Sequence, residues 1–233
     1  MIKKLKNALR RKRLALAGVS VELQLPTAVY GSGGGSWELF PGSLDAQSVV
    51  YSFGVGRDIS LDLELIEKHG MQVHAFDPTP VSIAWLEQQS LPPGLVFHDY
   101  GIAAEDGEIE FYAPRKSSSA HFTPVQRYRV APQERVRARV RALRSIMRDL
   151  GHTRIDLLKM DIEGGEYDVI EDIVRQKIPI GQLLIEFHHM YETIPLSRTL
   201  DAIESLRGTG MNVYAISERS YEISLADPNL MTA

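Results

Sequence analysis

The most chemically informative stretch of the sequence is a set of acidic side chains that follows a largely apolar run. Residues 155–160 are followed at once by Asp161, and then by Glu163 and Glu166. Ligands bind at the carboxyl ends of parallel strands, so three acids in that place indicate a functional edge of a sheet. We expect Asp161 to meet a cation or an incoming hydroxyl group there. Glu166 begins the next helix, where the helix dipole favours an acid, so a structural role is as reasonable for it as a functional one.

A carboxylate and two imidazoles close the next apolar run. Glu186 lies near the end of residues 182–187, and His188 and His189 follow it. Such groups can act as a base, as a clamp on a substrate or as metal ligands. Because side chains alternate along a strand, Glu186 and His188 share one face, so we expect His188 rather than His189 to reach the site. The acids have no recognised metal spacing, and a divalent metal bridging Asp161 and Glu186 is a secondary hypothesis.

Two glycines follow an earlier apolar run. Gly54 and Gly56 come directly after residues 49–53, so the backbone can turn sharply there and a ligand can approach it closely. Asp77, 21 residues after Gly56, ends a second short run, where a carboxylate can accept hydrogen bonds from ribose hydroxyls. The order of strand, glycine turn, helix, strand and acid predicts a nucleoside-binding site.

The glycine turn departs from the dinucleotide-binding pattern. Ile59 stands where the third glycine of that pattern is expected, and Asp58 would repel a pyrophosphate at the start of the helix. A ligand with an ammonium or sulfonium group meets no such repulsion. An NAD(P)-linked reductase is therefore disfavoured, and it stays open as an alternative function.

Short β-rich runs alternate with amphipathic helical ones from residue 49 onward. We expect strands at 49–53, 73–76, 95–98, 108–112, 155–160, 182–187, 211–216 and 221–225. We expect helices at 58–69, 81–89, 166–175 and 197–208. This alternation predicts an α/β fold with a mostly parallel sheet and helices on both faces. The last two strands are joined by a tight turn and should pair antiparallel.

Composition and charge exclude several classes of site and partner. The sequence has no cysteine, which excludes disulfides, thiolate zinc sites and cysteine nucleophiles and fits a cytoplasmic location. Residues 1–13 hold seven of the 26 Lys and Arg and no acid, leaving 19 basic and 30 acidic residues, a net charge of −11. Such an acidic body should not attract nucleic acid.

The basic residues 1–27 are expected to form a helical extension, and residues 28–233 a single domain with an insertion or lid at 113–140. Leu5 and Leu9 stand among the basic residues, so the helix can lie on an anionic membrane surface. A solvated helix that packs loosely on the domain, or on a second subunit of a homo-oligomer, is the alternative that charge-rich helices favour. Residues 115–122, which include His121, have the composition of a loop that covers the site.

Eight arginines lie between residues 127 and 148, and four of them alternate: Arg135, Arg137, Arg139 and Arg141. On a strand these four would share one face. They could clamp an anionic substrate, or they could protect an exposed edge strand from aggregation by their charge. We favour the second interpretation.

The motifs described above make the sequence resemble the FkbM methyltransferases over roughly residues 28–226. Residues 156–166 carry the most specific part of the resemblance, and residues 54–60, 75–80 and 184–188 support it. The family usually has a glycine turn of the form G-A-N-x-G, whereas this chain has G-V-G-R-D, which resembles a branch with G-x-G-x-D-I-S. A Tyr-Gly-Gly-Trp-like motif of that branch appears here as residues 30–37, stretched by small residues.

The resemblance implies a Rossmann-like methyltransferase fold with a seven-stranded, mostly parallel sheet and an antiparallel C-terminal hairpin strand. It also implies methyl transfer from S-adenosylmethionine to a small-molecule or glycan acceptor, most often to a hydroxyl oxygen of a sugar, glycan or polyketide-like metabolite. Carried over residue by residue, the cofactor site comprises Ser52, Gly54, Gly56, Asp77, Pro78, Asp99, Gly101 and Asp161. The acceptor site comprises Glu163, Glu186, His188 and His121.

Methyl transfer to oxygen needs an in-line arrangement and a group that takes the acceptor's proton. Asp161 and His188 are the candidate bases, and Glu163 is the candidate clamp on the substrate. A divalent metal would help by lowering the pKa of the hydroxyl, which keeps the metal hypothesis open. A non-catalytic interaction module with the same fold is the remaining alternative, and the retained Asp77, Asp161 and Glu163 disfavour it.

Overall fold

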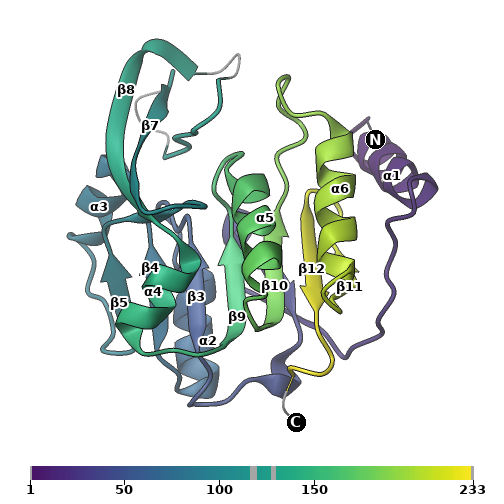
Figure 1. Cartoon of the computed structure of the whole chain (residues 1–233), viewed down its shortest axis with the longest axis horizontal. Coiled ribbons are helices and arrows are strands. Elements are labelled where there is room, and N and C mark those ends of the chain that lie inside the picture. Colours follow the sequence, from purple (N-terminus) through teal and green to yellow (C-terminus); the bar gives the residue numbers. More distant parts are fainter. Residues whose placement is uncertain (1, 116–119, 127–129, 232–233) are drawn as a thin grey trace.

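The computed structural model describes residues 2–115, 120–126 and 130–231. A seven-stranded sheet runs through the molecule in the order β11-β12-β10-β9-β3-β4-β5 (Figure 1). Its strands are β3 (Val50–Phe53), β4 (Val73–Phe76), β5 (Leu95–His98), β9 (Ile155–Met160), β10 (Ile180–Glu186), β11 (Asn212–Ile216) and β12 (Glu222–Ala226). All seven were expected from the sequence, with bounds that shift by two residues at most.

The sheet is parallel except at β12. The pairs β3–β4, β4–β5, β3–β9 and β9–β10 are parallel, whereas β12 pairs antiparallel with both β10 and β11. The predicted Rossmann-like methyltransferase fold with an antiparallel C-terminal hairpin strand is therefore confirmed. Every residue of β3 and β4 is buried, as expected for central parallel strands that are covered on both faces.

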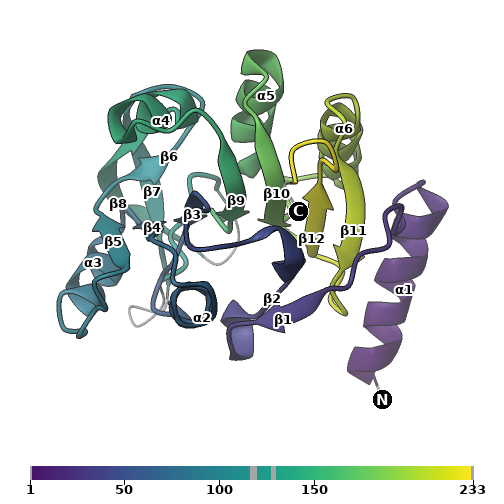
Figure 2. The same cartoon turned by 90° about the horizontal axis from the view of Figure 1, so that it is seen from below.

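Five helices cover the two faces of the sheet: α2 (Ser60–His69), α3 (Pro80–Leu86), α4 (Leu143–Leu150), α5 (Glu166–Gln176) and α6 (Leu196–Arg207). Figure 2 shows α4, α5 and α6 on one face and α2 and α3 on the other. Each face has its own apolar core. Of these five, only α4 was not expected, because its residues were interpreted as part of the basic stretch. Its buried face is made by Leu143, Ile146 and Met147.

A short hairpin beside α2 was also not expected. Its strands, β1 (Ala28–Tyr30) and β2 (Trp37–Leu39), pair antiparallel and contain three residues each. Three residues are too few for an alternating pattern to be recognised. The hairpin packs on the α2 side of the sheet, where Tyr30, Trp37 and Leu39 are buried.

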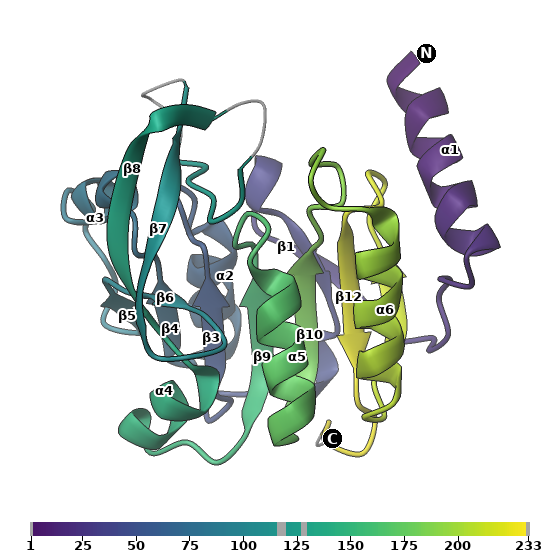
Figure 3. The same cartoon turned by 45° about the horizontal axis from the view of Figure 1, so that its top comes forward.

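A second sheet extends beyond the carboxyl ends of the central strands (Figures 1 and 3). It contains β6 (Gly101–Ile102), β7 (Gly107–Pro114) and β8 (Val130–Arg141) in the order β6-β8-β7. The insertion expected at 113–140 overlaps the end of β7 at residues 113–114 and β8 at residues 130–140, which pair antiparallel. Residues 116–119 of the expected covering loop lie outside the described residues.

The alternating arginines of β8 have partners on neighbouring elements. Arg135 and Arg137 pair with Glu110 on β7, and Arg141 pairs with Asp149 on α4. Arg139 and Arg141 also lie over the ring of Tyr100. These contacts favour the structural interpretation of the stripe over a substrate clamp; Arg127 and Arg129 lie outside the described residues.

The basic N-terminal segment forms α1 (Ile2–Leu16), which lies beside α6 (Figures 1 and 3). Asn7 donates a hydrogen bond to Glu218, Arg10 lies over the ring of Tyr221, and Leu14 is buried in the core. The helical extension is shorter than the expected 1–27, since the amide groups of residues 22 and 23 donate to the carbonyl of Val213 on β11. Among the described residues, none of the helices has the length and apolar character needed to cross a membrane.

Candidate functional site

A cavity of about 1470 Å³ opens at the carboxyl ends of the central strands. Ligand pockets typically measure about 300–1,000 Å³, so this cavity has room for more than one small molecule. Of the residues expected to form the site, it is lined by Ser52, Gly54, Gly56, Asp77, Pro78, Gly101, His121, Asp161, Glu163, Glu186 and His188.

Asp99 is the exception among the expected site residues. Its side chain is exposed and does not line the cavity, whereas that of the next residue, Tyr100, is buried. β5 ends at His98, and Asp99 lies in the bend that follows it, where its side chain faces solvent. Gly101 brings the same segment back to the cavity wall.

The glycine turn after β3 fits directly against the end of β9. Gly54 has a φ of +74°, and a Cβ added there would lie 1.7 Å from the carbonyl oxygen of Asp161. Only glycine tolerates both the left-handed backbone and this contact. The turn therefore holds the predicted nucleoside-binding loop beside the acidic segment.

Asp77 fastens the glycine turn to the start of α3. Its Oδ2 accepts a hydrogen bond from the amide of Gly56 at 2.8 Å, and its Oδ1 accepts bonds from the amide and hydroxyl of Thr79 at 2.9 and 2.6 Å. A carboxylate offers about four acceptor positions, so one remains for a ligand hydroxyl. The residue expected to hold a ribose thus also shapes the loop around it.

Lys159 is a site residue that the sequence analysis missed. It is buried on β9, and its Nζ donates to the carbonyl oxygens of Phe53 and Gly54 at 3.0 and 2.8 Å. The same Nζ lies 5.6 Å from the centre of the Trp37 ring. The available signal was a lysine near the end of a mostly apolar strand, because a buried lysine needs partners.

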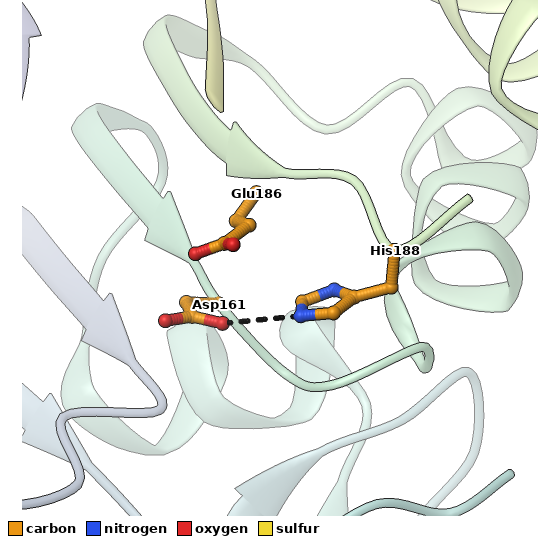
Figure 4. Close-up of side chains that lie close together, drawn as sticks. All are labelled: Asp161, Glu186 and His188. Carbon is orange, nitrogen blue, oxygen red and sulfur yellow. Dashed lines mark ion pairs between the residues drawn. The ribbon is translucent and has the colours of Figure 1, made fainter. Parts of the chain in front are cut away.

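An imidazole surrounded by carboxylates occupies the other side of the cavity. Nε2 of His188 lies 3.7 Å from Oδ1 of Asp161 and 3.7 Å from Oε2 of Glu163. Figure 4 shows the His188 ring and the Glu186 carboxylate converging on Asp161. Nδ1 of His188 donates to Oε1 of Glu166 at 3.2 Å, and that oxygen also accepts the amide of His188. Glu166, which is fully buried, therefore orients the ring so that Nε2 faces the cavity.

Glu163 links its own turn by hydrogen bonds to the segment around residues 121–123 and to Tyr191. It has a left-handed backbone with a φ of +54°. Its carboxylate accepts hydrogen bonds from Nδ1 of His121 and from the hydroxyl of Tyr191, and its carbonyl accepts one from the hydroxyl of Thr123. His121 is thereby joined to the acidic segment, and Tyr191 is a further cavity residue that the sequence analysis did not identify.

Neighbouring charges and burial separate the proton affinities of these groups. Burial raises the pKa of Asp161, and burial together with the charge of Asp161 raises the pKa of Glu186 to about 7. Burial also opposes the ionisation of Glu163, but hydrogen bonding from His121 and the charge of His188 lower its pKa to about 2. Burial lowers the proton affinity of His188, yet Glu166, Asp161 and Glu163 outweigh it and raise its pKa to about 10.

These shifts assign different states to the groups at neutral pH. His188 carries a proton and a positive charge, and Glu163 is ionised. Asp161 and Glu186 have the higher proton affinities among the carboxyl groups, so they are better suited than His188 to accept a proton. The ligand atoms of Asp161, Glu186 and His188 lie within 4.8 Å of one another, a spacing that one cation can bridge (Figure 4). Nε2 of His188 is also the ion-pair partner of Asp161 and Glu163, so the metal hypothesis stays secondary.

His189 contacts a different part of the molecule. Its Nδ1 lies 3.1 Å from the hydroxyl of Thr199, and its ring packs edge-on against Tyr221. It does not line the cavity within the described part of the chain. The alternation of side chains therefore separates the two histidines as expected.

Comparison with known proteins identifies one family. A model of the methyltransferase FkbM domain matches residues 49–208, more than half of the chain. The probable methyltransferase-like protein 24 of Homo sapiens is 30% identical over 144 residues, which cover 61% of this chain and 33% of the human protein. The Rattus norvegicus protein of the same name is 29% identical over the same length. The chain thus spans about a third of the length of these curated relatives.

Among solved structures, the methyltransferase FkbM from Methylobacillus flagellatus aligns with a TM-score of 0.49 and 14% identity. The alignment covers 78% of this chain and 44% of that chain.

Proposed function

The chain belongs to the FkbM methyltransferase family, and from this premise we propose that it uses S-adenosylmethionine to methylate a hydroxyl oxygen of a sugar, glycan or polyketide-like metabolite. The observation that carries the proposal is the contact between the glycine turn and the acidic segment. Gly54 lies against the carbonyl of Asp161, so a nucleoside held by the turn ends beside the carboxylates.

The residues of the cavity fit this cofactor. The left-handed Gly54 and Gly56 leave backbone exposed to a ligand, and Asp77 keeps one acceptor position for a ribose hydroxyl. The cavity volume of about 1470 Å³ leaves space for an acceptor beside the cofactor. When bound, S-adenosylmethionine supplies an electrophilic methyl group on a sulfonium centre.

The acidic cluster supports a role in taking the acceptor's proton. Asp161 has a raised pKa, and its buried Oδ1 has no hydrogen-bond partner within the described residues, so it is the preferred base. His188 stays charged beside it and stabilises the carboxylate before the proton arrives. Glu163 remains ionised and acts as the clamp, because a carboxylate accepts hydrogen bonds from further hydroxyls of the acceptor.

The charge of the cavity favours a neutral acceptor rich in hydroxyl groups. Arginine and lysine side chains also line the cavity, but acidic side chains outnumber them, and Asp161, Glu163 and Glu186 lie where the acceptor is expected. The alternating arginines of β8 are not among the lining residues. Carboxylates repel an anionic acceptor and accept hydrogen bonds from a polyol. This chemistry suits a sugar or glycan better than a phosphorylated metabolite.

The test combines binding with transfer. Calorimetry should show saturable binding of S-adenosylhomocysteine to the wild type and at least 10-fold weaker binding to Asp77→Ala. Transfer of labelled methyl from S-adenosylmethionine to a panel of neutral sugars and glycans should fall by about 10²-fold in Asp161→Asn, the usual range for loss of a general base. Asp201→Asn, an exposed acid on α6, is the matched control and should keep both properties.

Absence of adenosyl binding in the folded wild type would contradict the proposal. Binding of NADH instead would support the reductase alternative. Full transfer by Asp161→Asn would contradict the role of that carboxylate as the base.

We also propose that α1 attaches the protein to an anionic membrane surface. Leu5, Leu9 and Leu16 are 63%, 59% and 80% exposed, and at 3.6 residues per turn they share one face of the helix. Asn7 and Leu14 occupy the opposite, docked face. An apolar stripe among lysines and arginines complements a surface of anionic lipids.

A further inference from the structure

Two buried polar side chains on the wall of the cavity have unpaired atoms. Asp62 and Ser52 are each 1% exposed. The hydroxyl of Ser52 faces Asp62 closely enough to lower the pKa of that carboxyl group, but Oδ1 of Asp62 and Oγ of Ser52 make no hydrogen bond of ordinary geometry within the described residues. Native proteins rarely leave a buried carboxylate oxygen and a buried hydroxyl unpaired, so the pair indicates a group that joins them when a ligand binds.

Both residues border the glycine turn. Ser52 lies in β3, two residues before Gly54, and Asp62 lies in the first turn of α2, which follows the same glycine turn. Both line the cavity together with Trp37 and Gly35 of the N-terminal hairpin. The hairpin is held against α2, because the amide of Gly31 donates to Glu64 at 2.7 Å. These elements enclose the end of the cavity beyond the glycine turn from the acidic cluster.

The charge of Asp62 requires a cation that the protein does not provide in direct contact. Lys159 is near enough to oppose the effect of burial, which raises the pKa of Asp62 to about 6. The ammonium group of Lys159, however, already donates to the carbonyls of Phe53 and Gly54. A ligand cation with N–H donors would satisfy both Asp62 and Ser52.

The cofactor of the proposed function has two cationic groups, and only one of them fits this place. A sulfonium has no N–H and cannot donate to Oδ1 of Asp62 or Oγ of Ser52. It must also lie near the acceptor and therefore near Asp161. The α-ammonium group of the methionine end has three donors and lies at the opposite end of the molecule from the adenine.

We infer that Asp62 and Ser52 form the subsite for the α-ammonium group of the cofactor, with Trp37 closing the pocket around it. The inference rests on the proposed function, since it assumes a cofactor with an amino-acid end. Asp62 accepts one N–H of the ammonium group and Ser52 accepts another. The subsite thereby selects cofactors with an amino-acid tail over nucleosides that lack one.

The test compares two ligands that differ in that tail. Calorimetry measures the binding of S-adenosylhomocysteine, which has the amino-acid end, and of 5′-methylthioadenosine, which lacks it. Asp62→Asn should weaken the binding of S-adenosylhomocysteine by about 10- to 100-fold, which is the effect of losing a charge-assisted hydrogen bond. The same substitution should change the affinity for 5′-methylthioadenosine by less than about 3-fold. Ser52→Ala should show the same selectivity with a loss of about 3- to 10-fold.

Glu67→Gln, an exposed acid on the same helix, is the matched control and should bind both ligands as the wild type does. Retained binding of 5′-methylthioadenosine also shows that each variant is folded. Equal loss of affinity for both ligands, or unchanged affinity for S-adenosylhomocysteine, would overturn the assignment of the subsite. If the wild type binds neither ligand, the proposed function itself fails, which distinguishes the two results.

Discussion

One imidazole and four carboxyl groups set the electrostatics of the cavity. Glu166 holds Nδ1 of His188, and Asp161, Glu163 and Glu186 surround the opposite side of the ring. A positive charge among these acids is what allows several of them to share one site. The cluster therefore acts as a unit, and removal of the imidazole should affect every carboxyl group around it.

This arrangement predicts a specific dependence of stability on pH. The pKa of His188 is raised to about 10 in the folded protein from an ordinary value of about 6.5. A raised pKa contributes stability that is fully present below pH 6.5 and is lost as the pH rises to 10. We expect His188→Gln to lower the free energy of unfolding by about 2 kcal/mol at pH 6 and by much less at pH 10.

Denaturant unfolding at a series of pH values measures this difference. His189→Gln is the matched control, because burial lowers the pKa of His189 to about 4 and keeps it neutral over the whole range. The difference in the free energy of unfolding between His189→Gln and the wild type should therefore stay the same from pH 6 to pH 10. A constant difference between His188→Gln and the wild type from pH 6 to pH 10 would show that His188 is not held in its charged form.

At the scale of elements, the turns between strands and helices bring the site together. The turn after β3 meets the end of β9 at Gly54, and Asp77 joins it to the start of α3. Residues of β7, Val140 of β8 and Trp37 of β2 also line the cavity. The sheet therefore supplies a rigid base, while the elements outside it shape the space for ligands.

The exposed leucines of α1 provide the prediction at this scale. The wild type should sediment with vesicles containing anionic phospholipid and not with neutral ones, and salt should weaken the association. The double substitution Leu5→Gln and Leu9→Gln should reduce binding by at least 10-fold, because it removes the apolar groups that enter the interface. Val29→Gln is the control, since Val29 is 62% exposed on β1, away from the basic helix.

Equal sedimentation with neutral vesicles, or unchanged binding of the leucine variant, would contradict attachment through α1. A dimer in solution that the leucine variant abolishes would instead assign this face to a second copy of the chain.

At the scale of the whole molecule, the large cavity makes ligand binding a test of global stability. A ligand present at 100 times its Kd stabilises the folded state by about 2.7 kcal/mol. For a chain of this size that corresponds to an increase of about 5–10 °C in Tm. We expect S-adenosylhomocysteine to produce this increase in a thermal unfolding experiment and NADH to produce none. An increase with NADH alone would contradict the choice of cofactor.

The sequence by itself determined the succession along the chain of the seven central strands and of four of the five helices that cover them, and the position of the main chemical groups. The main chemical groups could be located because each lies at or just after the end of a recognisable apolar run. They are the glycine turn, Asp77, Asp161, Glu163 and Glu186. Local patterns of this kind depend on residues close together in the chain. That is why the bounds of the central strands were predicted within two residues.

Only the tertiary structure decided which distant residues share the cavity. Lys159 contacts the carbonyl of Phe53 across 106 positions of sequence, and Glu166 orients His188 across 22. Asp62 carries no local sign of function, since its unpaired oxygen becomes apparent only when α2 packs on the sheet. Asp99 lies in the bend after β5 and does not line the cavity within the described residues, which the sequence pattern alone could not show. Spacing along the chain predicts where strands end, whereas packing between elements determines which side chains meet there.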